Sequence, residues 1–381
     1  MSRSSYVWVD ACLLSILFLV IGVSCQDAAG SSEVIRGVNL GGWLVTEPWI
    51  SPSLYSSGAD DEWSLCNGLG KRSCSSVLQS HWESFFTRDD IVDIKAAGLN
   101  SLRIPVGYWA VDVTDFEPYV TGQYPYLIRA VNWARELGLT VLIDLHGAPG
   151  SQNGQDNSGL IGPVLFQTNT SNGDRSLNVL RNLTEEFSRD IYGGVVTGIE
   201  LLNEPRLSSM GFTMGQLTSF YTAGSSVIRA ASNTVNVTFH VGEWSLETGT
   251  APNTTSSRQN RDNGQAKRTW MRLMFEAQLA AYSPNGPGQR SIGWYYWTWK
   301  TEYDIDTWSY RRGVEQGYIP SDVSNSSTLA FPRLANGCVD SNFNYTAPAR
   351  PGRTSAATPA RPCTVGAPIT SILGVLAIFV L

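Results

Sequence analysis

The run Gly198-Ile-Glu-Leu-Leu202 is apolar apart from one acid and leads directly into Asn203-Glu204-Pro205. A second acid, Glu243, follows the stretch Val235–Phe239, which is rich in the β-branched and aromatic residues that favour strands. Two carboxyl groups placed just past buried strands suit glycoside hydrolysis, because one protonates the leaving oxygen while the other, ionised, attacks or stabilises the anomeric carbon. The two acids therefore predict glycosidase chemistry on a sheet.

Strand-like and helix-like segments alternate from residue 35 to about residue 300. This alternation predicts βα units, in which helices cover a parallel sheet. The runs expected to form strands are Ile35–Asn39, Asn100–Val106, Thr140–Leu145, Val195–Leu202, Val237–Val241 and Ser291–Trp297. The predicted fold class is α/β, of the (β/α)8 TIM-barrel type.

The helices expected between these strands carry start and stop signals. Thr87 and Asp90 have the spacing of a capping box, while Gly98 and Gly138 follow the last helical residues of two segments. The apolar stripes expected to be buried are Leu127, Val131 and Ala134, then Leu180, Leu183, Phe187 and Ile191, then Leu217, Phe220, Tyr221 and Ile228, and finally Trp270, Leu273, Met274 and Ala277.

The composition suits one globular domain. With 381 residues, 42% of them hydrophobic, the chain can bury the core of an α/β barrel, which takes about 250 residues. We expect one catalytic domain over residues 26–331. The net charge is −6 and Lys and Arg are scattered, so there is no basic patch for nucleic acid or for an anionic membrane surface. A monomer without a nucleic-acid partner is expected.

The N-terminal region predicts export. Arg3, the apolar stretch Ala11–Val23 and the small residues before Gln26 are typical of a secretory signal peptide, expected over residues 1–25. Six Asn-x-Ser/Thr triplets are candidate glycosylation sites, at Asn169, Asn182, Asn236, Asn253, Asn325 and Asn344.

The C-terminal region predicts a lipid anchor. Residues 332–357, with Pro, Thr, Ala and Arg in irregular order, are expected to form a linker. The apolar tail Ile369–Leu381 is shorter than the about 20 residues that a spanning helix needs. We therefore interpret residues 358–381 as the removed signal for a glycosylphosphatidylinositol (GPI) anchor; a frayed apolar tail is the alternative. The expected location is the cell surface or cell wall, with membrane contact only through the anchor.

Cysteine and histidine usage predicts one disulfide and no metal site. Cys66 and Cys74 are the expected disulfide pair in an oxidising compartment. Cys338 then either pairs with a retained Cys363 or keeps its thiol. No Cys-x-x-Cys motif occurs and the three histidines lack the spacing of metal ligands, so no metal or other cofactor is expected.

Polar residues that follow apolar runs are the candidate site residues, because the loops at the carboxyl ends of barrel strands open on one face. Each has an ordinary structural explanation as well: a salt bridge, a loop cap or, for the tryptophan, the core. The candidates are Glu47, Arg103, His146, Asn203, Glu204, Glu243 and Trp299.

The motifs around these residues resemble those of the exo-β-1,3-glucanases of glycoside hydrolase family 5. They are Val38–Pro48, Asp144–Asn153, Asn203-Glu204-Pro205, Gly242-Glu243-Trp244 and Trp299–Glu302, and the likeness runs from about Ile35 to Pro320. The resemblance implies a retaining enzyme on a (β/α)8 barrel that acts on β-1,3-glucan, with its acid/base and nucleophile after the fourth and seventh strands.

The resemblance also implies residue roles. Glu204 would be the general acid/base and Glu243 the nucleophile, with their carboxyls about 5–5.5 Å apart. Glu243 is expected to stay ionised beside a cation such as Arg103, while a drier setting favours protonated Glu204. Asn203 would bind the sugar 2-hydroxyl. The residues that would line the pocket for the terminal glucose are Glu47, His146, Asp156, Asn157 and Trp299.

Two departures from the family pattern have consequences. Gln155 stands in the Gly-x-Asp-Asn loop where the family has an aromatic clamp, so leaving-group binding should be weaker or altered. Glu204 and Glu243 are only about 40 residues apart, whereas one βαβ unit takes about 30 residues. The interval fits one helix and one strand where the family needs three of each. We therefore expect an incomplete barrel of about six strands, with two βα units missing between Glu204 and Glu243.

The missing units would take with them the family's His-x-Tyr motif, which supports the nucleophile, and its second clamp aromatic. Three interpretations follow. The natural protein has two further units that this sequence lacks, or the chain is an inactive relative that at most binds glucan, or it is a compact active variant.

Overall fold

A computed structural model describes residues 34–208, 210–235, 241–247, 259–283, 292–334 and 338–348. All of them belong to one compact unit that starts at Val34. The expected signal peptide, the anchor signal, the sequons Asn236 and Asn253 and all of the predicted strand Val237–Val241 except its last residue lie outside the described residues. In this part of the chain, no helix combines the length and apolar character needed to cross a membrane.

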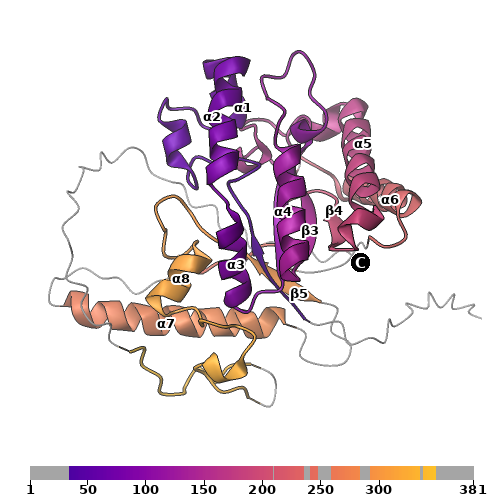
Figure 1. Ribbon diagram of the computed structural model, residues 1–381. Coiled ribbons are helices and arrows are strands. Elements are labelled where there is room, and N and C mark those ends of the chain that lie inside the picture. The colour runs from indigo at the N-terminus through magenta and orange to yellow at the C-terminus, as the bar shows by residue number, and fades with distance from the viewer. Residues whose placement is uncertain are drawn as a thin grey trace, which may run out of the picture. The chain divides into compact units, whose positions relative to one another are not determined.

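Five parallel strands form the sheet, in the order β4-β3-β2-β1-β5. Figure 1 labels β3, β4 and β5 of this sheet. Each of the five strands overlaps a segment expected from the sequence. Their bounds are β1 Ile35–Asn39, β2 Ser101–Gly107, β3 Thr140–Gly147, β4 Val196–Glu200 and β5 Gly293–Tyr296.

The segment that leads to Glu243 lies beside β5. Val241 forms a parallel bridge with Trp294: its N–H donates to Gly293 and its carbonyl accepts from the N–H of Tyr295. Among the described residues, nothing pairs with the outer edge of β4 as a strand. A closed barrel would need that edge to connect round to Val241. The sheet is therefore open, as the short interval between the two acids predicts.

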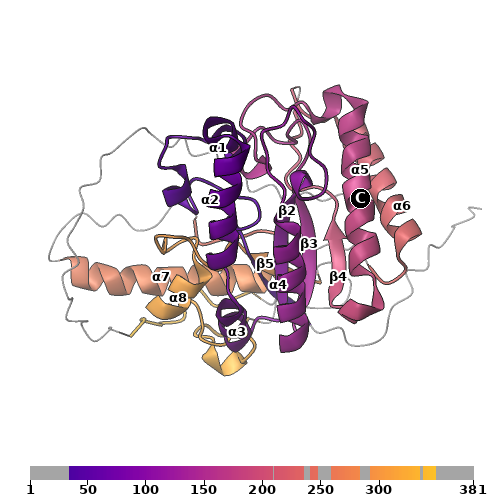
Figure 2. The same ribbon diagram turned by 45° about the horizontal axis from the view of Figure 1, so that its top comes forward.

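Helices cover the sheet, and the two views agree that α5 and α6 lie side by side next to β4 (Figures 1 and 2). The α-helices are α1 Glu62–Leu69, α2 Lys71–Ser84, α3 Arg88–Ala96, α4 Tyr124–Leu137, α5 Thr170–Phe187, α6 Met214–Ala231, α7 Gln259–Tyr282 and α8 Tyr310–Gln316. Short 3-10 helices are η1 Pro52–Tyr55, η2 Tyr108–Ala110, η3 Asp156–Ser158, η4 Phe166–Thr168, η5 Asp190–Tyr192 and η6 Ser326–Thr328.

The predicted helix signals are confirmed in two helices. Thr87 caps α3 through the expected box with Asp90. Gly138 ends α4 in the left-handed conformation, with φ 67°. Both caps supply partners for backbone groups that a helix end leaves unsatisfied.

Two apolar stripes are partly wrong. Ile191 was expected on the buried face of α5, but that helix ends at Phe187 and Ile191 is 53% exposed in η5. In α7 the fully buried side chains are Met271 and Phe275 rather than the predicted Trp270 and Met274. The reason is that α7 packs against two apolar clusters on different sides, which blurs its periodicity.

The inner face of the sheet is polar at the end that carries the site. Successive strand residues point to opposite faces. In β2, Leu102 and Ile104 therefore point to the helices and Arg103 points inward, where it is fully buried. Lower down, the Tyr295 ring fills the interior, and a Cβ added to Gly37 would lie 2.1 Å from it.

The fold extends past the predicted domain end at residue 331. Phe331 and Val339 form a small cluster with Ala280 of α7. The N–H of Ala347 donates to Thr269 Oγ1 at 2.9 Å, and Gln265 donates to the carbonyl of Ala347. Val339, Tyr345 and Ala347 of the expected linker are therefore packed at α7, while most of its other described residues are exposed.

The disulfide and sequon residues can be placed where they are described. Cys66 of α1 and Cys74 of α2 are bonded to one another, and Cys338 is exposed. The side chains of four sequon residues are exposed: Asn169, Asn182, Asn325 and Asn344.

Candidate active site

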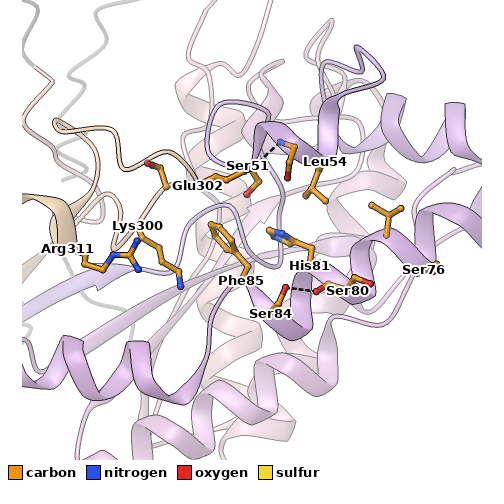
Figure 3. Close-up of a pocket in the computed structure, with 13 residues that line it drawn as sticks. Ser51, Leu54, Ser76, Ser80, His81, Ser84, Phe85, Lys300, Glu302 and Arg311 are labelled. Carbon is orange, nitrogen blue, oxygen red and sulfur yellow. Dashed lines mark hydrogen bonds between the residues drawn. The ribbon is translucent and has the colours of Figure 1, made fainter. Parts of the chain in front are cut away.

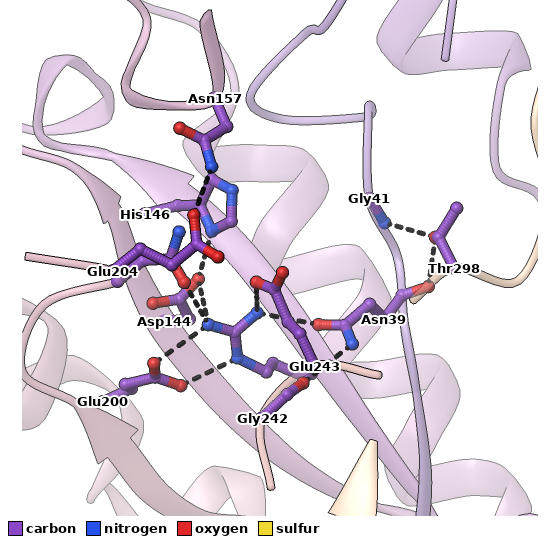
Figure 4. Close-up of polar contacts among 12 residues, drawn as sticks. Asn39, Gly41, Asp144, His146, Asn157, Glu200, Glu204, Gly242, Glu243 and Thr298 are labelled. Carbon is purple, nitrogen blue, oxygen red and sulfur yellow. Dashed lines mark hydrogen bonds and ion pairs between the residues drawn. The ribbon is translucent and has the colours of Figure 1, made fainter. Parts of the chain in front are cut away.

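Arg103 is at the centre of the polar cluster at the carboxyl end of the sheet. Figure 4 shows its partners Asn39, Asp144, Glu200 and Glu243. The Arg103 side chain is buried and its guanidinium reaches residues from three strands and from the segment after Val241. The contacts are to Glu200 at 2.7 and 2.9 Å, Asn39 at 2.9 Å, Glu243 at 2.6 Å, Asn203 at 2.9 Å and Asp144 at 3.0 Å. Breaking a buried pair on one side costs about 3–5 kcal/mol, so this cluster fixes the geometry of its members.

Glu243 is held on two sides. Its Oε1 accepts from Arg103, and the carbonyl of Gly242 accepts from Asn39 Nδ2 at 3.0 Å. Burial raises the pKa of Glu243 to about 7 against the opposing effect of Arg103, and the charge of Glu204 raises it further. Burial therefore favours the protonated form of Glu243, against the expectation that it stays ionised.

Glu204 has the opposite setting. It is exposed, and its Oε2 accepts from Asn157 Nδ2 at 2.9 Å. The expected drier environment is wrong, because the Glu204 side chain is exposed beside the open edge of β4. Its φ of 42° lies in the left-handed region, which costs a non-glycine residue about 1–3 kcal/mol and is common at functional sites. Backbone bonds from Asn203 to Leu145 and from Arg206 to Gln152 hold that conformation.

The two acids face the same space beside His146 (Figure 4). His146 Nδ1 donates to Asp144 Oδ2 at 2.6 Å. Burial lowers the pKa of His146 to about 4, so the ring is neutral and its Nε2 is an acceptor. The Trp297 indole lies parallel to this ring, with centroids 5.3 Å apart.

Buried polar atoms without a partner among the described residues indicate where a ligand binds. Four of them belong to predicted site residues: Glu47 Oε1, His146 Nε2, Asn203 Nδ2 and Trp299 Nε1. Burial and the charge of Asp156 raise the pKa of Glu47 well above its usual value, so its carboxyl can donate as well as accept. A mixed set of donors and acceptors matches hydroxyl groups, each of which does both.

The loop that carries η3 forms a polar wall. Asp156 and Asn157 are both half-buried, and Asn157 is the residue that binds Glu204. Burial raises the pKa of Asp156. Gln155, at the position of the absent aromatic, is exposed.

Most predicted residues gather at this place, but Trp299 does not. Its indole is 2% exposed and stacks on Tyr310 of α8 in the apolar core. Trp297 takes the position beside His146 instead. The two tryptophans are two residues apart, and both lie beyond the end of β5 at Tyr296.

The sequence reasoning missed four residues of the cluster, which are Asn39, Asp144, Glu200 and Trp297. A signal was available for three of them. Asn39, Asp144 and Glu200 are polar residues inside otherwise apolar strands, on the same sheet face as Arg103.

A cavity of about 660 Å³ lies elsewhere, between α2, η1 and the segment after β5 (Figure 3). None of the predicted site residues lines it. Its walls include Ser51, Ser80, His81, Phe85, Lys300 and Arg311. Among the described residues, no group of three or more His, Cys, Asp and Glu side chains could hold a metal ion.

Comparison with known proteins places the chain in a family. Residues 70–276 match the family model described as cellulase (glycosyl hydrolase family 5). A probable glucan 1,3-beta-glucosidase A of Aspergillus fumigatus is 33% identical over 408 residues, covering 81% of this chain and 95% of that protein. The 408 aligned positions outnumber the 381 residues of this chain, so the relative has residues that this chain lacks.

Other relatives match more closely over a shorter span. The protein of the same name from Aspergillus clavatus is 51% identical over 193 residues, 50% of this chain and 45% of that protein. In such matches the chain spans about half the length of the relative. Glucan 1,3-beta-glucosidase 1 of Schizosaccharomyces pombe is 32% identical, covering 79% of this chain and 91% of that protein.

Solved structures support the fold alone. The rutinosidase from Aspergillus niger superposes with a TM-score of 0.61 at 21% identity, covering 75% of this chain and 98% of that one. The structure named AoRut gives 0.62 at 22% identity, with 75% and 96% covered. From the family model and the full-length relative together, this chain belongs to glycosyl hydrolase family 5.

Proposed function

We propose that the protein is a retaining exo-β-1,3-glucanase that removes terminal glucose from β-1,3-glucan during cell-wall remodelling. The names of its relatives support this substrate class. The observation that carries the proposal is the position of Glu243, held by Arg103 at 2.6 Å and facing the same space as Glu204. A carboxylate nucleophile and a second carboxyl group that can donate a proton are the pair that a retaining reaction requires.

In this mechanism Glu204 protonates the glycosidic oxygen while Glu243 attacks the anomeric carbon and forms a glycosyl-enzyme. A water molecule, deprotonated by Glu204, then releases glucose and restores Glu243. Asn203 Nδ2 and His146 Nε2 bind sugar hydroxyls. The exposure of Glu204 gives its proton direct exchange with solvent.

The expected location is part of the proposal. The predicted signal peptide and anchor signal favour a secreted protein tethered to the outer cell surface by a GPI anchor. The exposed sequon side chains are compatible with glycosylation there.

A second candidate function is a surface protein that binds glucan without hydrolysing it. The open β4 edge beside Glu204 favours this alternative, because a displacement of about 1 Å can cost 100-fold in rate. Loss of the aromatic at Gln155 removes a contact to the leaving sugar.

Glucose release from laminarin by the purified chain separates the two. The first proposal expects release, abolished in Glu243→Gln. The control is Glu117→Gln, since Glu117 is also paired with an arginine, Arg175, but lies in another loop. A folded chain that binds laminarioligosaccharides in calorimetry without releasing glucose supports the second function. A folded chain that neither binds nor hydrolyses refutes both.

A further inference from the structure

We propose that Glu62 is a positioning residue of the sugar pocket, through which α1 holds the three loops that surround the pocket on the side of Glu47, Asp156 and Asn157. The inference adds a residue role to the proposed function. The identity of the ligand, a β-glucan oligosaccharide, rests on that proposed function. The residue stands outside all the motifs of the family resemblance and touches none of the candidate catalytic groups.

Glu62 is a buried acid whose partners lie in the loop before Glu47 and in η2. Its side chain is fully buried, and Oε2 accepts from the N–H of Thr46 at 3.0 Å and from Thr46 Oγ1 at 2.9 Å. Oε1 accepts from Trp109 Nε1 at 2.8 Å. No ion pair to this carboxylate occurs within the described ranges. An acid buried without a cation is costly, so these three bonds are what retain it.

The bonds to Thr46 fix the residue that precedes Glu47. The carbonyl of Glu47 accepts from Ile50 and Ser51, so a tight turn follows, and Glu47 Oε2 accepts from Trp49 Nε1 at 2.8 Å. Because the backbone is held on both sides of Glu47, its Oε1 is directed into the proposed pocket, where it has no partner among the described residues. A shift of Thr46 would move that atom directly.

The bond to Trp109 fixes the orientation of an indole ring that packs against the carboxyl ends of β2 and β3. The indole is fully buried and stacks on Tyr119 with centroids 4.3 Å apart. A Cβ added at Gly107, Gly147 or Gly159 would lie 2.4 to 2.6 Å from its atoms. Three glycines therefore admit this ring at the ends of β2 and β3 and against the turn after η3. Its orientation sets how closely η3 approaches the pocket.

The neighbouring residues complete the attachment of η3. Asp61 Oδ2 accepts from the N–H of Ile161 at 2.6 Å, while its Oδ1 caps α1 at Ser64. The N–H of Trp63 donates to the carbonyl of Gly159. The start of α1 thus binds the loop of Asp156 and Asn157 from two directions.

The test is Glu62→Gln. A glutamine amide presents an N–H₂ group to either Thr46 or Trp109, both of which are donors, so at least one bond is lost. We expect the Kd for laminarioligosaccharides to rise about tenfold, which corresponds to about 1.4 kcal/mol. The kcat should change much less than KM, because Arg103 holds Glu243 without any contact to Glu62. Amide hydrogen exchange should accelerate in residues 41–51 and 154–162.

The matched control is Glu276→Gln. Glu276 is 1% exposed, pairs with Arg272 and accepts from the N–H groups of Ala330 and Phe331, so it is an equally buried acid that anchors a different loop. The Glu276→Gln variant should lower Tm by about as much as Glu62→Gln does. It should leave the Kd for laminarioligosaccharides unchanged and accelerate amide hydrogen exchange only near residues 330–331.

Thr46→Val provides a second variant. Since Thr46 and Glu62 act through one contact, the double variant with Glu62→Gln should lose less affinity than the sum of the single losses. The inference is overturned if Glu62→Gln changes Kd no more than Glu276→Gln, or if exchange rises only within α1. If the wild-type chain binds no oligosaccharide, the proposed function fails, and the exchange comparison still decides the role of Glu62.

Discussion

At the scale of single residues, one buried cation faces an excess of negative charge. Arg103 contacts Asp144, Glu200 and Glu243, and Glu204 adds its charge to the same region. Burial raises the pKa of Glu243 to about 7, against the opposing charge of Arg103, and the nearby carboxylates Glu204 and Asp144 raise it further.

The rate of glucose release should therefore depend on pH around neutrality. Glu243 attacks only when ionised, and its raised pKa means that kcat/KM should climb as pH rises through about 7. The unfolded state ionises this group near its ordinary 4.5, so its contribution to folding stability is full below that value and falls as pH rises toward 7. Initial rates on laminarin from pH 5 to 9 check the first expectation. A kcat/KM that stays constant between pH 6 and 8 would contradict it.

Replacing Arg103 by lysine should disable the site. Lysine keeps the charge but cannot make the forked bonds to Glu200 or reach several acceptors at once. We expect kcat to fall by about 100-fold or more, with a lower Tm. Arg175→Lys is the control: Arg175 also binds two acids, Asp112 and Glu117, but at a partly exposed place. A kcat in Arg103→Lys equal to that of the control would show that the cluster does not position Glu243.

At the scale of elements, the strands were predictable because long apolar runs end in turn residues, and α3 and α4 were predictable from their caps. Helices α1 and α2 were not, since α1 has only 8 residues and α2 contains five serines among its 14 residues. The sequence also did not show which of two nearby tryptophans, Trp297 or Trp299, lies beside His146. Side chains alternate along β5, so Trp297 continues the inward face of Tyr295, but the chain turns before Trp299 and sends it to the core.

Phenylalanine substitutions separate these two tryptophans. Trp299→Phe should lower Tm, since it removes packed atoms from the core, and should leave the Kd for laminarioligosaccharides unchanged. Trp297→Phe should raise that Kd with a smaller effect on Tm, because its ring lies beside His146. Calorimetric titration and thermal unfolding of both variants measure the contrast. If Trp299→Phe raised the Kd while Trp297→Phe mainly lowered Tm, Trp299 rather than Trp297 would be the residue that contacts the sugar.

At the scale of the whole molecule, the short interval between Glu204 and Glu243 indicated that two βα units are absent. It did not indicate how the segments on either side of the missing units would lie. In the structure Val241 remains beside β5 and the outer edge of β4 stays open. The two acids therefore flank an opening, with Arg103 reaching Asn203 on one side and Glu243 on the other. That arrangement depends on side-chain contacts across the sheet, which no local pattern encodes.

Restoring the two units should close the sheet. An insert of about 60 residues from a full-length relative, two units of about 30 each, placed after α6 should raise Tm and the rate of glucose release. The control is a glycine and serine insert of equal length, which adds chain without strands. Equal activity of the two inserts would show that closure is not what limits turnover.

The bond between Cys66 and Cys74 ties the geometry of the sugar pocket to the redox state of its surroundings. Cys66 lies one helical turn after Glu62, so the covalent link to α2 braces the same short helix that carries Asp61 and Glu62. In a reducing compartment such as the cytosol both sulfurs would be thiols, and the eight-residue helix would rely on its caps alone. Full affinity for sugar would then be acquired only once the chain has entered an oxidising environment.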